Sequence, residues 1–299
     1  MKSILIKLLI ALPIIYLALF VGLWSSVTDS RPIISLIDMI RSDSATEIID
    51  FSSDKEKSSK PKPKPNKDRN PYYGDLHVHT KHSFDAYIFG ITATPNDAYR
   101  YAKGDGIMHP MGYEMKLREP LDFYSVTDHG FFMGMLNAWS DTSTDISQKD
   151  FAKPFHDLNR VENLTAESAG PRSALFSQIL GGTVTQTYSD LNPNILKAWF
   201  TKNTQAALKS FDYEIHKSAW EDVARAANEH NDPGHFTTFI GYEFTTSTNV
   251  EGGNLHRNVI FNSSKAPIRP WTRIDSINPE DLWTWQDKLR DKGVDTVSI

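Results

Sequence analysis

From Pro71 onward, short apolar runs typical of strands alternate with segments that have the periodicity of amphipathic helices. The strand-like runs are 72–80, 121–130, 235–247, 255–261 and 294–299. The helical segments are 94–106, opened by Thr-Pro and closed by Gly104 or Gly106, 214–232 and 278–293. Residues 131–213 fit this alternation least and predict an excursion of mixed helix and loop. Strand–helix alternation is typical of α/β proteins, so we expect a parallel sheet or barrel.

The amino-acid composition excludes several kinds of functional site and partner. The chain has 299 residues, enough for one large domain or two small ones, and no cysteine. The absence of cysteine excludes disulfide scaffolds, thiolate zinc sites, iron–sulfur clusters and cysteine nucleophiles. A net charge of −5 supplies no general basic surface, so we expect no nucleic-acid partner.

The N-terminal residues 1–30 predict a membrane anchor or a signal segment. Residues 8–24 contain no charged side chain and follow Lys2 and Lys7, which favours an N-inside orientation. A spanning helix needs about 20 apolar residues, whereas the core of a signal peptide has about 7–15. An uncleaved anchor, a cleaved signal and a buried soluble helix all stay open. The first two place the remaining chain outside the cytoplasm, either membrane-anchored through the N-terminal helix or secreted.

Residues 31–70 predict a juxtamembrane stem followed by a linker. Apolar residues in 31–51 recur at helical spacing and can form a short amphipathic helix. Alternating Lys and Pro in 52–70 favour an extended, solvated chain. A basic patch for an anionic lipid or polymer is the alternative interpretation of this stretch.

Polar side chains that can hold a metal follow the first predicted strand. Asp75, His77 and His79 fall at every second position and therefore on one face of a regular strand. The two imidazoles can bind one metal ion, and Asp75 can orient an imidazole from behind. Asp85 follows in a segment where a turn can return its carboxylate to the same centre.

Further polar residues end later strands. His129 closes the run 121–130, Glu243 comes late in an apolar run, and His256 opens the strand after a Gly-Gly pair. Glu243 is suited to bridging two metals, and His256 to binding one as a terminal ligand. Asp128 points away from His129 on a regular strand, which leaves it as either a ligand or a supporting group. His82, inside the first motif, can also reach metal or substrate.

These residues resemble a known family. The segments DLHVHT, SFDA and VTDHG, followed by a late-strand Glu and a His, are similar to the PHP (polymerase and histidinol phosphatase) superfamily. The block 71–130 resembles most closely its uncharacterised branch, domain of unknown function 3604. The resemblance covers residues 71–299 and implies a metal-dependent hydrolase domain there.

The resemblance implies a distorted barrel of parallel strands with two or three divalent metals at the carboxyl ends. Members are typically phosphoesterases that use Zn, Mn or Fe, and a ligand set of nitrogen and oxygen suits all three. By position, the metal ligands would be His77, His79, Asp85, His129, Glu243 and His256.

The family pattern continues beyond the residues present in this sequence. It places a His on the next strand and an Asp-x-His on the last, whereas VDTVSI runs to Ile299. We therefore expect a C-terminally truncated chain, an incomplete barrel and a half-built metal centre.

The resulting hypothesis is metal-assisted hydrolysis of a small-molecule or envelope ester, with Glu243 and Asp128 as catalytic groups. Arg257, beside His256, can hold an anionic oxygen of the substrate or be structural. The alternative is a catalytically inactive, metal-poor module at the membrane. The substrate and the oligomeric state have no signal in the sequence.

Overall fold

The structure is a computed structural model that describes residues 45–52, 64, 66–184, 211–247, 254–276 and 278–299. Residues Thr46–Ile299 form one unit, which contains every described helix and strand. The apolar segment 8–24 and nearly all of the Lys-Pro stretch lie outside the described residues. Within the described part of the chain, no helix is long and apolar enough to cross a membrane.

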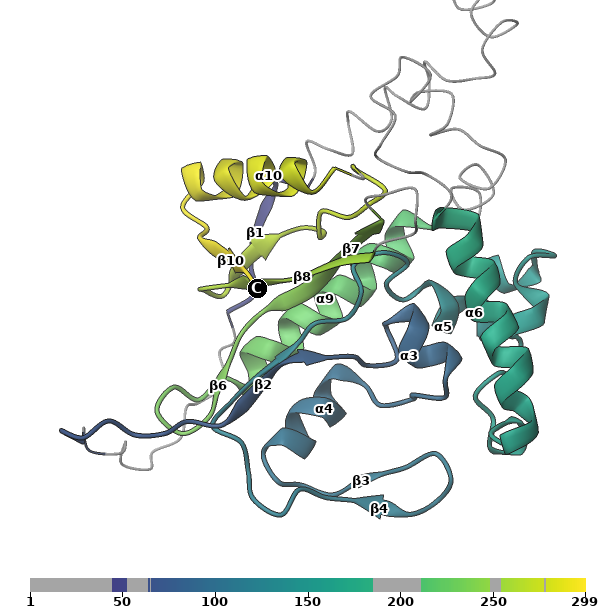
Figure 1. The fold of residues 1–299 in the computed structure, drawn as a ribbon, viewed down its shortest axis with the longest axis horizontal. Helices are drawn as coiled ribbons and strands as arrows, with labels where there is room; N and C mark the ends of the chain where they lie inside the picture. The colour runs from purple at the N-terminus through teal and green to yellow at the C-terminus, as the bar shows by residue number, and fades with distance from the viewer. Residues whose placement is uncertain (1–44, 53–63, 65, 185–210, 248–253, 277) are drawn as a thin grey trace, which may run out of the picture. The chain divides into compact units, whose positions relative to one another are not determined.

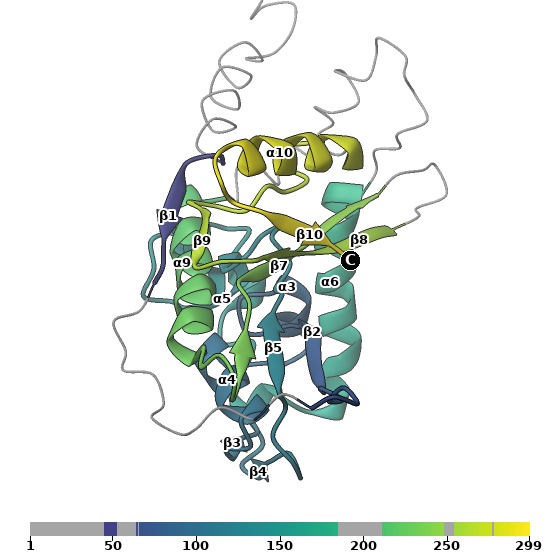
Figure 2. The same ribbon diagram turned by 90° about the vertical axis from the view of Figure 1, so that its left-hand side faces the viewer.

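A parallel sheet carries the first half of the site. Its strands are β2 (Gly74–Val78), β5 (Phe123–Val126) and β6 (Thr237–Thr238), with β5 in the middle. Helices α4 (Pro95–Ala102) and α9 (Tyr213–His230) contact each other and β5 (Figures 1 and 2). Both helices begin where the sequence provides a cap, a Thr94–Asp97 capping box for α4 and Asp212 for α9. This part of the α/β prediction is confirmed.

The second sheet is antiparallel, which corrects the expectation of parallel strands throughout. Its order is β10 (Thr296–Ser298), β8 (Asn254–Phe261) and β7 (Gly241–Ser247). Only six residues separate β7 from β8, and a parallel crossover needs about a dozen or more. The run 235–247 therefore splits into β6, which extends the parallel sheet, and β7, which starts the antiparallel one.

Two short strand pairs complete the described sheets. Strands β3 (Ile107–Met108) and β4 (Glu114–Met115) form a hairpin, and β1 (Ile48–Asp50) pairs with β9 (Lys265–Pro267). The amphipathic helix expected over 31–51 is therefore wrong at residues 48–50. The described residues form no closed barrel, because their strands divide into these four separate sheets.

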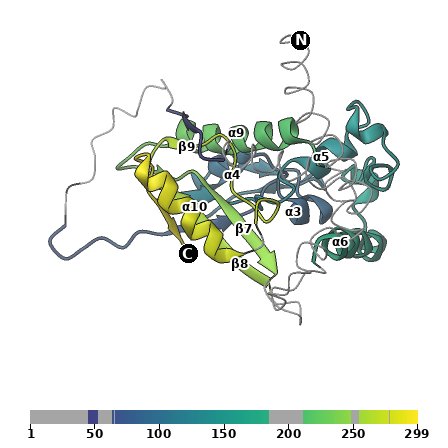
Figure 3. The ribbon, with the colours of Figure 1, turned by 90° about the horizontal axis from the view of Figure 1, so that it is seen from above.

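Aromatic packing fixes the antiparallel sheet. Tyr242 and Phe261 lie between Trp220 of α9 and Trp285 of α10 (Pro279–Asp291), with ring centroids 5.8–6.5 Å apart. In Figure 3, α9 and α10 flank β7. All four rings are almost completely buried, so this cluster contributes much of the apolar burial that holds β7 and β8 in place.

A second apolar cluster combines α3 (Phe84–Ile88), which precedes β5, with α5 (Met135–Ser140), α6 (Ala169–Val184) and the 3-10 turns Ile146–Gln148 and Lys153–Phe155 of the excursion after β5. The excursion also contains the 3-10 turns Val161–Asn163 and Ala166–Ser168. Phe84 packs against Phe131 in this cluster and also against the ring of His129, at 4.9 Å. The cluster therefore helps to hold the imidazole of His129 in place.

Candidate metal centre

The end of β5 continues alongside β7 and places His129 next to Glu243. The two residues form a parallel β-bridge, in which Gly130 N donates to Glu243 O at 2.9 Å and Glu243 N donates to Asp128 O at 3.0 Å. Backbone bonds therefore join the parallel and antiparallel sheets at this point.

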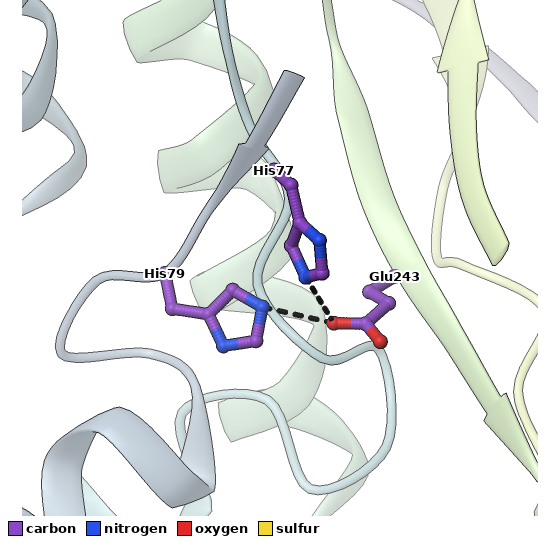
Figure 4. A group of neighbouring side chains, drawn as sticks. All are labelled: His77, His79 and Glu243. Carbon is purple, nitrogen blue, oxygen red and sulfur yellow. Dashed lines mark hydrogen bonds and ion pairs between the residues drawn. The ribbon is translucent and has the colours of Figure 1, made fainter. Parts of the chain in front are cut away.

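His77 lies in β2, which carries a bulge, and His79 directly follows the last residue of this strand. Asp75 pairs with Tyr124 and Val78 with Val126, so β2 has one more residue than β5 in this interval. Nε2 of His77 and Nε2 of His79 lie 3.1 and 2.8 Å from the same oxygen, Oε2 of Glu243 (Figure 4). Asp75 does not orient an imidazole as expected, because its carboxylate accepts a hydrogen bond from the backbone N of His77 at 2.9 Å.

Asp85 lies in the first turn of α3 and faces the same centre. Its Oδ1 is 3.1 Å from Nδ1 of His79, and its Oδ2 is 3.4 Å from Nε2 of His129. Ser83 donates to Oδ1 at 2.6 Å and so fixes the carboxylate. The turn expected after His79 therefore does return Asp85 to the two imidazoles.

His256 reaches the centre from β8. It lies directly opposite Thr245 of β7, and its Nδ1 contacts Oε1 of Glu243. The hydroxyl of Thr245 also lies 2.7 Å from Nδ1 of His129, so it helps to orient this imidazole.

The six residues form three overlapping groups, each of which could hold a metal ion. The groups are His77, His79 and Glu243; His79, Asp85 and His129; and His129, Glu243 and His256. The side chain of Glu243 is 1% exposed, whereas those of His77 and His256 are 55% and 41% exposed. The centre therefore combines a buried carboxylate with two imidazoles that are partly exposed to solvent.

The electrostatics of these groups suit a cation. Burial acts to lower the pKa of His79, but hydrogen bonds to Asp85 and Glu243 outweigh it and raise that pKa to about 10. Burial acts to raise the pKa of Glu243, but His79 and the neighbouring imidazoles lower it to about 2. Hydrogen bonds from His129 and His79 hold the pKa of Asp85 well below its usual range against the opposing effect of burial.

The donor set fits a divalent metal. The field that favours a proton on His79 also favours a metal cation among the same atoms. Four imidazoles and two carboxylates give nitrogen and oxygen donors, the set expected for Zn, Mn or Fe. The structure thus brings together all six residues predicted as ligands.

Asp128 lies apart from the three groups. It is fully buried and accepts hydrogen bonds from the backbone N and the hydroxyl of Thr80, at 2.5 and 2.6 Å. Burial raises its pKa above the usual value. Asp128 therefore anchors the loop after β2 and does not join the ligand groups.

The side chains of Arg257 and His82 also lie outside the three groups. Arg257 is opposite Phe244 on β7, so it faces away from Glu243 and His256. It donates to the carbonyl of His256 at 2.7 Å. Nε2 of His82 lies 2.8 Å from Asp222 of α9.

Sequence reasoning missed the residues that support the ligands. Thr245 falls two positions after Glu243, so the strand period could have placed it on the same face. Thr80 and Ser83 lie in the loop between His79 and Asp85, where hydroxyls carry no periodic signal.

Comparison with known proteins places the chain in a family. A family model described as protein of unknown function (DUF3604) matches residues 66–299. The chain belongs to the DUF3604 family. No curated protein and no solved structure matches it. All six clustered residues lie inside the DUF3604 match.

Proposed function

We propose that this DUF3604 domain is a metal-dependent hydrolase of phosphoric esters, and that the DUF3604 family is a branch of the PHP superfamily. The observation that carries the proposal is the convergence of three possible metal-binding groups around the buried carboxylate of Glu243. Members of the resembled superfamily place ligands at the same motif positions. The chemistry implied by that resemblance is ester hydrolysis with Zn, Mn or Fe.

The protein side of the mechanism is an arrangement of oriented donors. Asp85 and Ser83 contact Nδ1 of His79, which leaves Nε2 directed at Glu243. Thr245 contacts Nδ1 of His129. Such partners fix the ring orientation and tautomer of metal-binding histidines. Glu243 belongs to two of the groups, so its carboxylate would contribute to the binding of two metal ions.

When bound, divalent metals would supply Lewis acidity and lower the pKa of a water molecule toward neutrality. An ester could approach from solvent on the side of the exposed His77 and His256, whereas Glu243 and His129 are buried. The substrate is a small-molecule or envelope ester. We place the domain outside the cytoplasm, as a membrane-anchored or secreted enzyme.

The test uses the full chain, stripped with chelator and reloaded separately with Zn, Mn and Fe(II). Bis(p-nitrophenyl) phosphate and p-nitrophenyl phosphate serve as diester and monoester probes. We expect metal-dependent turnover of at least one probe, with His79→Ala inactive because His79 belongs to two of the groups.

The matched control is Glu221→Gln, which alters only two partly exposed ion pairs, with Lys217 at 3.8 Å and with Arg225 at 4.0 Å. It should keep the parent activity. A folded chain that binds none of the three metals would refute the proposal. A chain that binds metal yet cleaves neither phosphoester would refute the phosphoesterase assignment.

A further inference from the structure

The peptide group between Leu76 and His77 lies in the β2 bulge, and side chains complete its hydrogen bonding. Its carbonyl accepts from Nδ2 of Asn258 at 3.0 Å and from the hydroxyl of Thr127 at 3.4 Å. Its N–H donates to Asp75 at 2.9 Å. Because a bulge removes regular ladder bonds, these side chains decide how the peptide plane is oriented.

Asn258 is the partner that comes from the other sheet. It lies on β8 directly opposite Glu243, and it is 8% exposed. Within the described part of the chain, its Oδ1 has no hydrogen-bond partner, so the contact to Leu76 O is the amide's one bond there. An oxygen in place of Nδ2 would face the Leu76 carbonyl oxygen, so the donor orientation is required.

We infer that Asn258 is a positioning residue, which fixes the Leu76–His77 peptide so that the His77 imidazole reaches Glu243. His77 is the most exposed of the six clustered side chains, and little packing around its ring can replace this backbone restraint. The same amide ties the strand of His77 to the sheet of Glu243. The metal-binding readout of this inference rests on the proposed function.

The test compares Asn258→Ala and the isosteric Asn258→Asp with the parent chain, using Zn or Mn alone as the probe. Loss of a group that orients a ligand typically weakens metal binding about 10- to 100-fold. We expect that loss for one metal equivalent only, because the group of His79, Asp85 and His129 does not use His77. Asn228→Ala is the control, since it removes a hydrogen bond of the same type, from the side-chain amide of Asn228 to Ala224 O within α9.

A double-mutant cycle separates positioning from general destabilisation. In a His77→Ala background, Asn258→Ala should change metal affinity by no more than about twofold, because the imidazole that Asn258 positions is already absent. Equal losses in both backgrounds would overturn the inference, as would parent-like affinity in both Asn258 variants.

A metal-free readout keeps the inference testable if the proposed function fails. In chelated protein, Asn258→Ala should shift the imidazole ¹⁵N resonances of His77 and leave those of His216 unchanged. A parent chain without metal affinity would refute the proposed function alone. Unchanged His77 resonances would refute the positioning role of Asn258 with or without metal.

Discussion

Glu243→Gln is the substitution that most directly tests the centre. It keeps the side-chain shape but removes the charge that four imidazoles approach. A pKa lowered from 4.5 to about 2 corresponds to about 3 kcal/mol of folding free energy, since one pKa unit is about 1.4 kcal/mol. For a carboxylate with a lowered pKa, this stability is fully present above pH 4.5 and disappears as the pH falls through about 2.

At pH 7, the metal-free Glu243→Gln protein should therefore be about 3 kcal/mol less stable. For a domain of this size, the melting temperature would fall by about 6–12 °C. Metal affinity should fall by more than about 100-fold, because loss of an outer partner alone costs about 10- to 100-fold.

The assays are urea unfolding with chelator present and equilibrium dialysis followed by elemental analysis. Glu221→Gln makes the same chemical change on the surface of α9 and should shift neither quantity. If Glu243→Gln bound the parent number of metals with affinity within about threefold, the assignment of Glu243 as the shared ligand would be refuted.

Four further predictions address the surroundings of the centre. Arg257→Ala should leave metal content unchanged, because Arg257 faces away from Glu243; a lost equivalent in elemental analysis would contradict this. Burial lowers the pKa of His216 from 6.5 to about 4. The folded protein therefore keeps its full stability at this site above pH 6.5, and up to about 3 kcal/mol of folding free energy is lost as the pH falls from 6.5 through 4. His216→Gln, which can still donate to Gly130 O, should flatten that part of the pH–stability profile in urea unfolding. Asp222→Asn should cost about 1 kcal/mol, because its partly exposed bond to His82 is screened by solvent; calorimetry measures this loss. Chelation of metal-loaded protein should lower the melting temperature, and an unchanged melt would speak against binding to the folded state.

The secondary structure that could be predicted follows from local signals. Caps at Thr94 and Asn278 mark the starts of α4 and α10, and the apolar period places α9. The direction of β8 relative to β7 is decided by the length of the connection between them, a feature that strand–helix alternation does not contain. The strand at 48–50 shows the same limit, because its partner, 265–267, is more than 200 residues away in sequence.

The ligand residues were predictable because their chemistry is unusual at strand ends, where His77, His79 and Glu243 interrupt apolar runs. Strict alternation nevertheless misplaced Asp75, since a bulge breaks the period between Asp75 and Val78. It could not place Asn258 either. The contact of Asn258 with Leu76 joins residues 182 positions apart and depends on how two sheets meet.

The position of the centre follows from that meeting of sheets. His77 lies in the parallel sheet and His79 directly follows it, whereas Glu243 and His256 lie in the antiparallel sheet. His129, just beyond β5 of the parallel sheet, forms a β-bridge with Glu243 and contacts Thr245, both of which lie in the antiparallel sheet. Converging imidazole lone pairs and carboxylates need a shared proton or cation to lie this close, since isolated buried charges are costly. A cation bound there would join the two sheets, so metal affinity and the docking of β7 and β8 on β2 and β5 should be coupled.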